Sequence, residues 1–97
     1  MIYIITTQKR LYSTNEIRES TLAELFDYCR NKEELYVDTE TEGFDPYTNR
    51  LLSLQIGDKD NQFIIDCLTV DIRYTKYLFE DSSKTFLTYF DDVEISN

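Results

Sequence analysis

The sequence contains no histidine, no tryptophan and only two cysteines. Without histidine the chain has no imidazole to serve as a general base. Cys29 and Cys67 stand far apart, which does not fit the paired spacing of a zinc site. We therefore expect two reduced, buried thiols in a cytoplasmic protein.

Long apolar runs are also absent. No run approaches the roughly 20 apolar residues that a membrane span requires. The apolar start, residues 1–7, has no basic region before it and no small-residue cleavage site, so no signal peptide is expected. The 97 residues predict one domain, residues 1–97, with a thin margin of stability.

Basic residues are scarce relative to acidic ones. Ten lysines and arginines face 19 aspartates and glutamates, and the net charge is −9. Proteins that coat nucleic acid through broad phosphate contact are usually basic, which argues against that class. A nuclease site is itself a cluster of carboxylates that binds cations, so the acidity is compatible with a nuclease.

The apolar pattern predicts an α/β protein with a mixed, partly antiparallel sheet and flanking helices. The order is strand, helix, three strands, helix, strand. Predicted strands are 2–6, 35–41, 51–56, 63–68 and 84–90; predicted helices are 21–32 and 71–80; residues 8–19 are a predicted loop and 57–61 a turn. Thr21 and Glu24 form a capping box at the start of the first helix, and Asp71 can cap the second.

The segment from Val37 to Pro46 is the most informative part of the sequence. Side chains alternate along a strand, so Asp38 and Glu40 should share a face. Two adjacent carboxylates repel each other unless a cation lies between them, and such oxygen ligands suit Mg²⁺ or Mn²⁺. One alternative is that these acidic residues form a solvated, exposed run of charge without a ligand. Asp38 and Glu40 lie at the end of the apolar strand that begins at Leu35, which makes this alternative less favoured.

A calcium-binding loop is a second alternative for the same segment. Asp38, Glu40, Glu42 and Gly43 occupy the first, third, fifth and sixth positions of an EF-hand pattern. The twelfth position is Asn49 rather than the bidentate glutamate that the pattern requires. The preceding segment also reads as a strand rather than a helix, which disfavours this alternative.

Residues 38–46 read Asp-Thr-Glu-Thr-x-Gly-x-Asp-Pro, and residues 50–57 and 63–66 continue as a hairpin. This pattern resembles the first motif of the DEDD-type (DnaQ-like) 3′-5′ exonucleases, closest to the proofreading domains of family A DNA polymerases. The resemblance implies a ribonuclease H-like fold and two divalent ions, Mg²⁺ or Mn²⁺, acting on the 3′ end of single-stranded DNA. It also implies that Asp38 and Glu40 are catalytic metal ligands and that Thr41, Gly43 and Phe44 lie near the terminal nucleotide.

The later family motifs are not recognisable in this sequence. The second motif should carry an asparagine and a Phe-Asp pair after a strand such as 84–87; Asp91 could supply its aspartate as a third metal ligand. No third motif, with its general base and last aspartate, follows. We therefore expect a truncated domain that needs a missing C-terminal half or a polymerase partner. The alternative is an inactive nuclease fold that serves as a protein-binding module.

Overall fold

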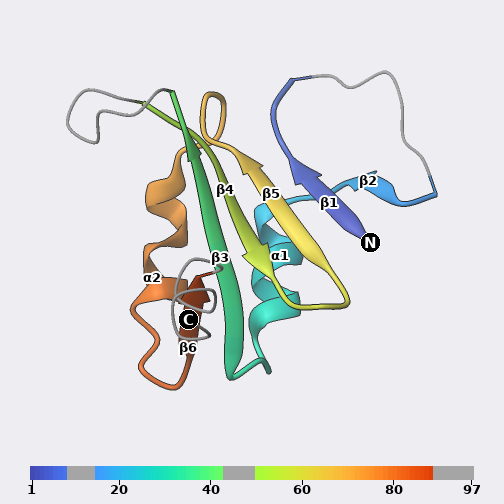
Figure 1. Ribbon diagram of the computed structural model, residues 1–97. Coiled ribbons are helices and arrows are strands. Elements are labelled where there is room, and N and C mark those ends of the chain that lie inside the picture. The colour runs from blue at the N-terminus through green and yellow to red at the C-terminus, as the bar shows by residue number, and fades with distance from the viewer. Residues whose placement is uncertain (9–14, 43–49, 89–97) are drawn as a thin grey trace, which may run out of the picture.

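The three strands predicted between residues 35 and 68 lie at the centre of a mixed sheet (Figure 1). The computed structural model describes residues 1–8, 15–42 and 50–88. Its elements are β1 (Ile2–Ile5), β2 (Ile17–Glu19), α1 (Leu22–Cys29), β3 (Glu34–Thr41), β4 (Leu51–Gly57), β5 (Gln62–Asp66), the 3-10 turn η1 (Ile72–Thr75), α2 (Lys76–Phe79) and β6 (Thr85–Thr88). The predicted α/β class is confirmed.

The described strands are ordered β2-β1-β5-β4-β3-β6 across the sheet. β3, β4 and β5 form an antiparallel meander, which is the pairing predicted for these segments. β1 runs parallel to β5, and β2 runs parallel to β1. At the other edge β6 runs parallel to β3, with Leu35 opposite Phe86.

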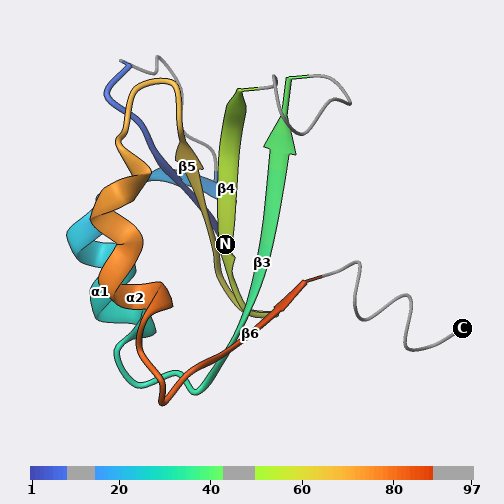
Figure 2. The ribbon, with the colours of Figure 1, turned by 90° about the vertical axis from the view of Figure 1, so that its left-hand side faces the viewer.

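Both described helices lie on the same face of the sheet (Figure 2). The side chains that alternate toward them form the core together with residues of α1 and α2. The buried apolar residues are Ile5, Leu25, Cys29, Leu35, Leu54, Ile56, Phe63, Ile65 and Leu78. The opposite face of the sheet carries neither helix, and the side chains of β3 that point there are free to carry charge.

Helix α1 begins with the Thr21 cap that was predicted, but Glu24 has a different partner from the one a capping box requires, and the helix ends earlier than predicted. The Thr21 hydroxyl accepts a hydrogen bond from the Glu24 amide at 3.1 Å. The Glu24 carboxylate accepts from the Ser20 hydroxyl at 2.9 Å, so its partner is a side chain that precedes the cap. The helix ends at Cys29 instead of residue 32. Burial raises the pKa of the Cys29 thiol to about 11, which keeps the thiol protonated.

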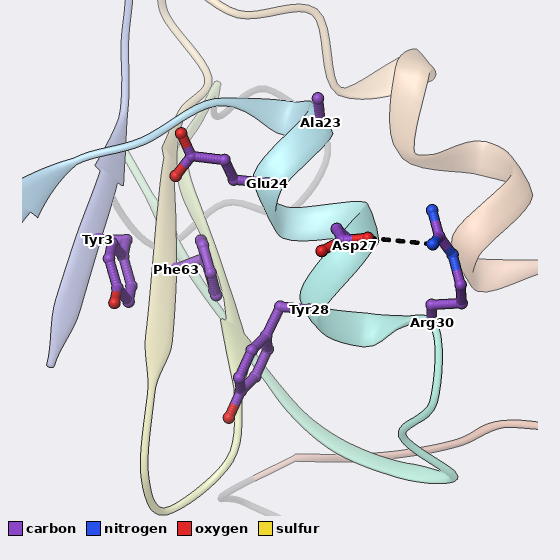
Figure 3. A pocket seen from close by; sticks show the side chains of 7 residues that line it. All are labelled: Tyr3, Ala23, Glu24, Asp27, Tyr28, Arg30 and Phe63. Carbon is purple, nitrogen blue, oxygen red and sulfur yellow. Dashed lines mark ion pairs between the residues drawn. The ribbon is translucent and has the colours of Figure 1, made fainter.

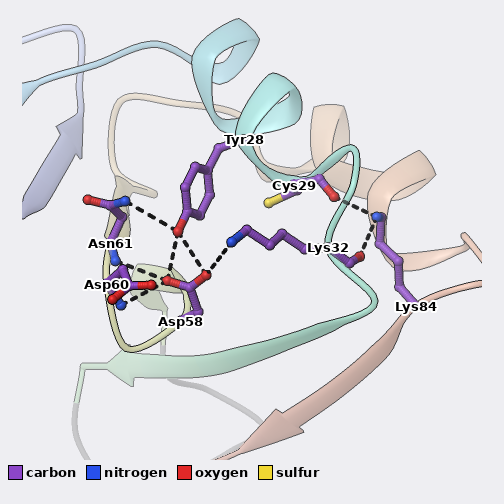
Figure 4. Close-up of polar contacts among 7 residues, drawn as sticks. All are labelled: Tyr28, Cys29, Lys32, Asp58, Asp60, Asn61 and Lys84. Carbon is purple, nitrogen blue, oxygen red and sulfur yellow. Dashed lines mark hydrogen bonds and ion pairs between the residues drawn. The ribbon is translucent and has the colours of Figure 1, made fainter.

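Lys84 lies at the start of β6 and satisfies the last carbonyls of α1 (Figure 4). Its ammonium donates to the carbonyl oxygens of Cys29 at 2.5 Å, Lys32 at 2.7 Å and Arg30 at 3.3 Å. Helix ends leave such carbonyls without intrahelical partners, and a cation there also complements the helix dipole. This side chain ties the edge strand to the helix on which the core depends.

Asp58 holds the β4–β5 turn against α1 (Figure 4). Its carboxylate accepts hydrogen bonds from the Tyr28 hydroxyl at 2.7 Å and from the amides of Asp60 and Asn61 at 3.0 Å. Lys32 adds an ion pair at 3.0 Å. Burial alone would raise the pKa of Asp58, but the hydrogen bonds from Tyr28, Asn61 and Lys32 outweigh it and hold that pKa well below its ordinary value.

The turn predicted at residues 57–61 also explains the glycine at its start. A Cβ atom on Gly57 would collide with the carbonyl oxygen of Asn61 and come within 2.7 Å of the Cα of Gln62. Both atoms belong to the backbone, which cannot move without breaking the β4–β5 pairing. Close approach of two backbone segments therefore requires glycine here.

Two further predicted elements differ from the structure. Residues 8–19 were predicted to be a loop, but Ile17–Glu19 forms β2; its three residues are too few to show an alternating pattern. The second helix is a 3-10 turn, capped by Asp71 through the Arg73 amide at 2.9 Å, followed by a single α-helical turn. The last strand is described only over Thr85–Thr88, and residues 89 and 90 lie outside the described residues. None of the described helices is long and apolar enough to cross a bilayer.

Replacing Lys84 with methionine should lower the free energy of unfolding by about 1–3 kcal/mol. The reason is that the carbonyls of Cys29, Arg30 and Lys32, at the end of α1 and just beyond it, lose a charged donor, while methionine keeps the apolar stem. Urea denaturation measures the change. The matched control is Lys76→Met, since Lys76 is exposed and pairs with Glu80 at 3.8 Å; its effect should stay within about 0.5 kcal/mol. Equal effects of the two substitutions would contradict the capping role.

Asp58 should make stability depend on acid pH. Because its folded-state pKa is depressed, its contribution is fully present above the unfolded-state pKa of about 4 and is lost as pH falls through the folded-state pKa. The difference in urea midpoint between the wild type and Asp58→Asn should be constant from about pH 5 to 7 and should narrow below about pH 4. A difference that widens in acid would refute this assignment.

Candidate metal and nucleic-acid site

The carboxylates of Asp38 and Glu40 project from β3 on the face of the sheet that carries no described helix. Leu35 is buried on the opposite face, and strand alternation sends residues 38 and 40 the other way. Two positions along a strand span about 6.6 Å, a separation at which flexible carboxylates can converge on one cation. Both side chains are exposed, so a cation and a substrate can reach them.

Strand β4 supplies the neighbours of this pair. Asp38 lies opposite Gln55, and Glu40 lies opposite Ser53. The Gln55 side chain donates a hydrogen bond to Gln62 of β5, which fixes its position beside Asp38. The Asp38 carboxylate itself accepts from the Thr39 amide at 2.9 Å. Among the described residues, neither Asp38 nor Glu40 forms an ion pair, so each is available to a metal ion.

The strand changes register just after the carboxylate pair. Between Glu40 and Thr41 the pairing with β4 shifts, and Thr41 lies opposite Leu51. Such irregularities bend a strand and redirect the side chains that follow. Thr41, predicted to lie near a nucleotide, is exposed at this end of β3. The strand runs through residues 38–41, so the calcium-loop alternative is wrong.

Three of the predicted site residues cannot be compared with the structure. Gly43 and Phe44, predicted near the nucleotide, and Asp91, predicted as a metal ligand, lie outside the described residues. Within residues 1–8, 15–42 and 50–88 no group of three acidic, cysteine or histidine side chains could hold a metal ion. Asp38 and Glu40 therefore fit part of a coordination shell for a hard cation and do not complete one.

The sequence did not indicate the neighbours that β4 contributes. The hairpin that continues the family pattern contains Gln55, Ser53 and Arg50. Only the strand register shows which of these residues lie opposite the carboxylates. Arg50 forms an ion pair with Glu42 at 3.3 Å, just beyond the pair. For Arg50 alone the sequence did contain a signal, because it is the only basic residue between Lys32 and Lys59.

Two hollows of the described surface lie on the helix-covered side. One of about 540 Å³ runs beside α1 and is floored by Tyr3 and Phe63, whose rings stack at 4.7 Å (Figure 3). Glu24 and the ion pair of Asp27 with Arg30 line its rim. A second hollow of about 350 Å³ lies between the helices. Neither contains Asp38 or Glu40, so volume does not mark the chemistry here. The carboxylates are presented on an open strand surface.

A comparison with protein-family models decides the family. Residues 16–96 match a model described as a 3′-5′ exonuclease, which spans most of the chain and includes the carboxylate pair. The chain belongs to this 3′-5′ exonuclease family. No curated protein matches the sequence.

Solved structures agree with the family. Escherichia coli RNase D, described as an exoribonuclease involved in structured RNA processing, is 28% identical over 69% of this chain and 18% of its own length, with a TM-score of 0.59. The exonuclease domain of Aedes aegypti Nibbler is 15% identical over 98% of this chain and 41% of its own, with a TM-score of 0.61. Brucella melitensis NrnC is 22% identical over 92% and 38%, with a TM-score of 0.58.

Two conclusions follow from these similarities. The sheet with its two helices has the ribonuclease H-like exonuclease fold, as the sequence predicted. The chain spans between 18% and 41% of the length of these solved chains, so it corresponds to a part of each. A second NrnC structure, 20% identical with a TM-score of 0.56, contains bound Mg²⁺.

The carboxylate pair should bind Mn²⁺ weakly. We expect Mn²⁺ to broaden NMR signals around residues 38–40 and 53–55 selectively, because paramagnetic relaxation reports even a fractionally occupied site. Asp38→Asn and Glu40→Gln should each reduce the broadening, since each removes a charged oxygen ligand. Glu34→Gln, at the far end of the same strand, is the matched control and should leave it unchanged. Equal broadening in all variants would exclude the pair as the site.

Proposed function

We propose that this chain provides the first part of a metal-dependent 3′-5′ exonuclease centre. The observation that carries the proposal is the placement of Asp38 and Glu40 side by side on an exposed strand of a chain that belongs to an exonuclease family. Mg²⁺ or Mn²⁺ held there would supply activation of a water molecule and neutralisation of charge at the terminal phosphodiester. The bound Mg²⁺ of NrnC supports this choice of ion.

The chain's own residues hold and orient the reactants in this proposal. Asp38 and Glu40 would bind the cation from the part of β3 that pairs with β4 at Gln55 and Ser53, which holds their backbone in place. Gln55, fixed by Gln62, offers a neutral amide next to Asp38 that can contact a phosphate oxygen without charge repulsion. Thr41 and the segment with Gly43 and Phe44 would position the terminal nucleotide.

We propose the 3′ end of single-stranded DNA as the substrate. The pattern of residues 38–46 most resembles the proofreading domains of family A DNA polymerases, which supports DNA. RNase D is described as acting on RNA, so a ribonucleotide oligomer of the same sequence is the necessary comparison. The 2′-hydroxyl distinguishes the two substrates.

The remaining metal ligands would come from outside the described residues. Asp91 is the candidate on this chain, and the rest of an exonuclease domain, or a polymerase that carries it, is the candidate partner. A second candidate function does not require a complete metal site, and the described residues contain no group of three side chains that could hold a metal ion. In that alternative the chain is a catalytically inactive module that binds another protein.

The chain alone should trim single-stranded DNA orders of magnitude more slowly than a complete exonuclease. The reason is that Asp38 and Glu40 supply two of the four family carboxylates, and two ligands activate water and neutralise the leaving oxygen less efficiently than four. End-labelled DNA and RNA oligomers with Mg²⁺ or Mn²⁺ measure the rate. Any residual trimming should vanish in Asp38→Ala and persist in the matched strand variant Glu34→Gln.

Two results would change this view. Robust trimming from the 3′ end that is lost in Asp38→Ala would show that a complete site forms, with Asp91 or a second copy of the chain as the source. Trimming that survives in both Asp38→Ala and Glu40→Ala would place the chemistry elsewhere and reject the proposal.

A further inference from the structure

The ion pair between Arg50 and Glu42 lies at the same end of the β3–β4 hairpin as the carboxylate pair. The amide of Glu42 donates to the carbonyl oxygen of Arg50 at 2.9 Å, so the two residues face each other directly beyond the last strand pairing. Glu42 is two positions past Glu40 in the chain. Arg50 is therefore a cation held next to a site where a nucleic-acid strand must arrive.

The contact that holds Arg50 is weak and uses little of its guanidinium. Nε donates to one oxygen of Glu42 at 3.3 Å, and the side chains are 68% and 59% exposed. Exposed pairs of this kind contribute about 0.2–1 kcal/mol. In the described part of the chain the Arg50 guanidinium contacts Glu42 through Nε. The high exposure of the side chain leaves the guanidinium accessible to a phosphate.

Arg73 provides a contrast within the same molecule. Its Nε and Nη2 both donate to Asp71, at 2.9 and 2.7 Å, which closes the fork on one carboxylate. Arg73 belongs to η1, on the helix-covered side of the sheet. It is 89% exposed, but Nε and Nη2 already donate to Asp71, and the residue lies on the other face of the sheet. The two arginines therefore differ in availability and in position while sharing charge and exposure.

Charge makes Arg50 distinctive at this site. Residues 33–58 contain Glu33, Glu34, Asp38, Glu40, Glu42, Asp45 and Asp58 but no other basic residue. A phosphate backbone that approaches this hairpin meets repulsion everywhere except at bound cations and at Arg50. Metal ions bound by Asp38 and Glu40 would neutralise these carboxylates, whereas a phosphate farther along the strand would need a cation from the protein.

We propose that Arg50 binds a backbone phosphate of the nucleic-acid strand whose 3′ end lies at Asp38 and Glu40. This inference rests on the proposed function and adds a positioning residue to it. Glu42 holds the guanidinium near the site without substrate and gives it up to the phosphate, which accepts two parallel hydrogen bonds in place of one long contact. Because it contacts the backbone, Arg50 contributes equally to all sequences.

The test is binding of a fluorescein-labelled oligothymidylate, followed by anisotropy with Mg²⁺ over a series of salt concentrations. Arg50→Gln should weaken binding about tenfold, as for loss of a hydrogen bond to a charged group. It should also make the slope of log K against log salt shallower by about 0.7, the value for one phosphate contact on a single strand. Arg50→Lys should keep the salt slope and recover part of the affinity.

Two matched variants complete the design. Arg73→Gln removes the same charge from the other face and should change neither the affinity at moderate salt nor the slope. Glu42→Gln should tighten binding, because it releases Arg50 and removes a negative charge. The urea midpoint of each variant shows whether it is folded like the wild type. If Arg50 had a purely structural role, variants with an unchanged midpoint would also have an unchanged salt slope.

The inference is overturned if Arg50→Gln and Arg73→Gln behave alike, or if the wild type shows no saturable binding. Its failure is separable from that of the proposed function, because Mn²⁺ binding and the Asp38→Ala comparison do not involve Arg50. Metal binding at Asp38 with no effect of Arg50→Gln would reject the phosphate contact alone.

Discussion

Strand β3 is hydrogen-bonded on both sides, to β4 and to β6, so neighbours on two edges fix its register. The side-chain period of a strand is two, and a slip of one residue would exchange its faces. Burial of Leu35 beneath the helices prevents that slip, since the alternative would remove leucine from the core and expose it to water. The site is thus a consequence of core packing. The same alternation that builds the core presents the two carboxylates on the opposite face.

The polar contacts that fasten the helices gather at the end of the hairpin away from the site. Asp58 binds Tyr28 and Lys32, and Lys84 binds the last carbonyls of α1 (Figure 4). These contacts join α1 to the β4–β5 turn and to the start of β6. The end with Glu40 has a register shift and a long, exposed ion pair between Arg50 and Glu42. Its charged groups are accessible to ligands, as functional sites commonly require.

The sequence predicted the elements whose signal is local. The central strands and their pairing followed from apolar segments separated by a turn, and α1 followed from its cap and apolar stripe. β2 was missed because it has only three residues, which is too short for a periodic pattern, and its pairing partner β1 is distant in the sequence. The length of α1 was overestimated because Lys84, far away in the sequence, satisfies the carbonyls at its end. At the site, Asp38 and Glu40 were predictable from alternation. Gln55 was not, because cross-strand neighbours depend on register.

A net charge of −9 would ordinarily oppose binding of a polyanion. Two kinds of positive charge could offset this repulsion, namely metal ions at the carboxylates and Arg50 beside them. In the proposed function the carboxylates of β3 would repel phosphate only while they lack cations, and bound metal ions would make this part of the hairpin the point of attachment. The attraction of such metal ions for phosphate would act over a few ångströms, because salt screens charges beyond about 10 Å at moderate ionic strength. A strand longer than its terminal nucleotide therefore needs a separate positive group, and Arg50 is the one that the hairpin contains. On this argument the broad acidity limits nonspecific attachment along the chain, and binding concentrates where metal and arginine act together.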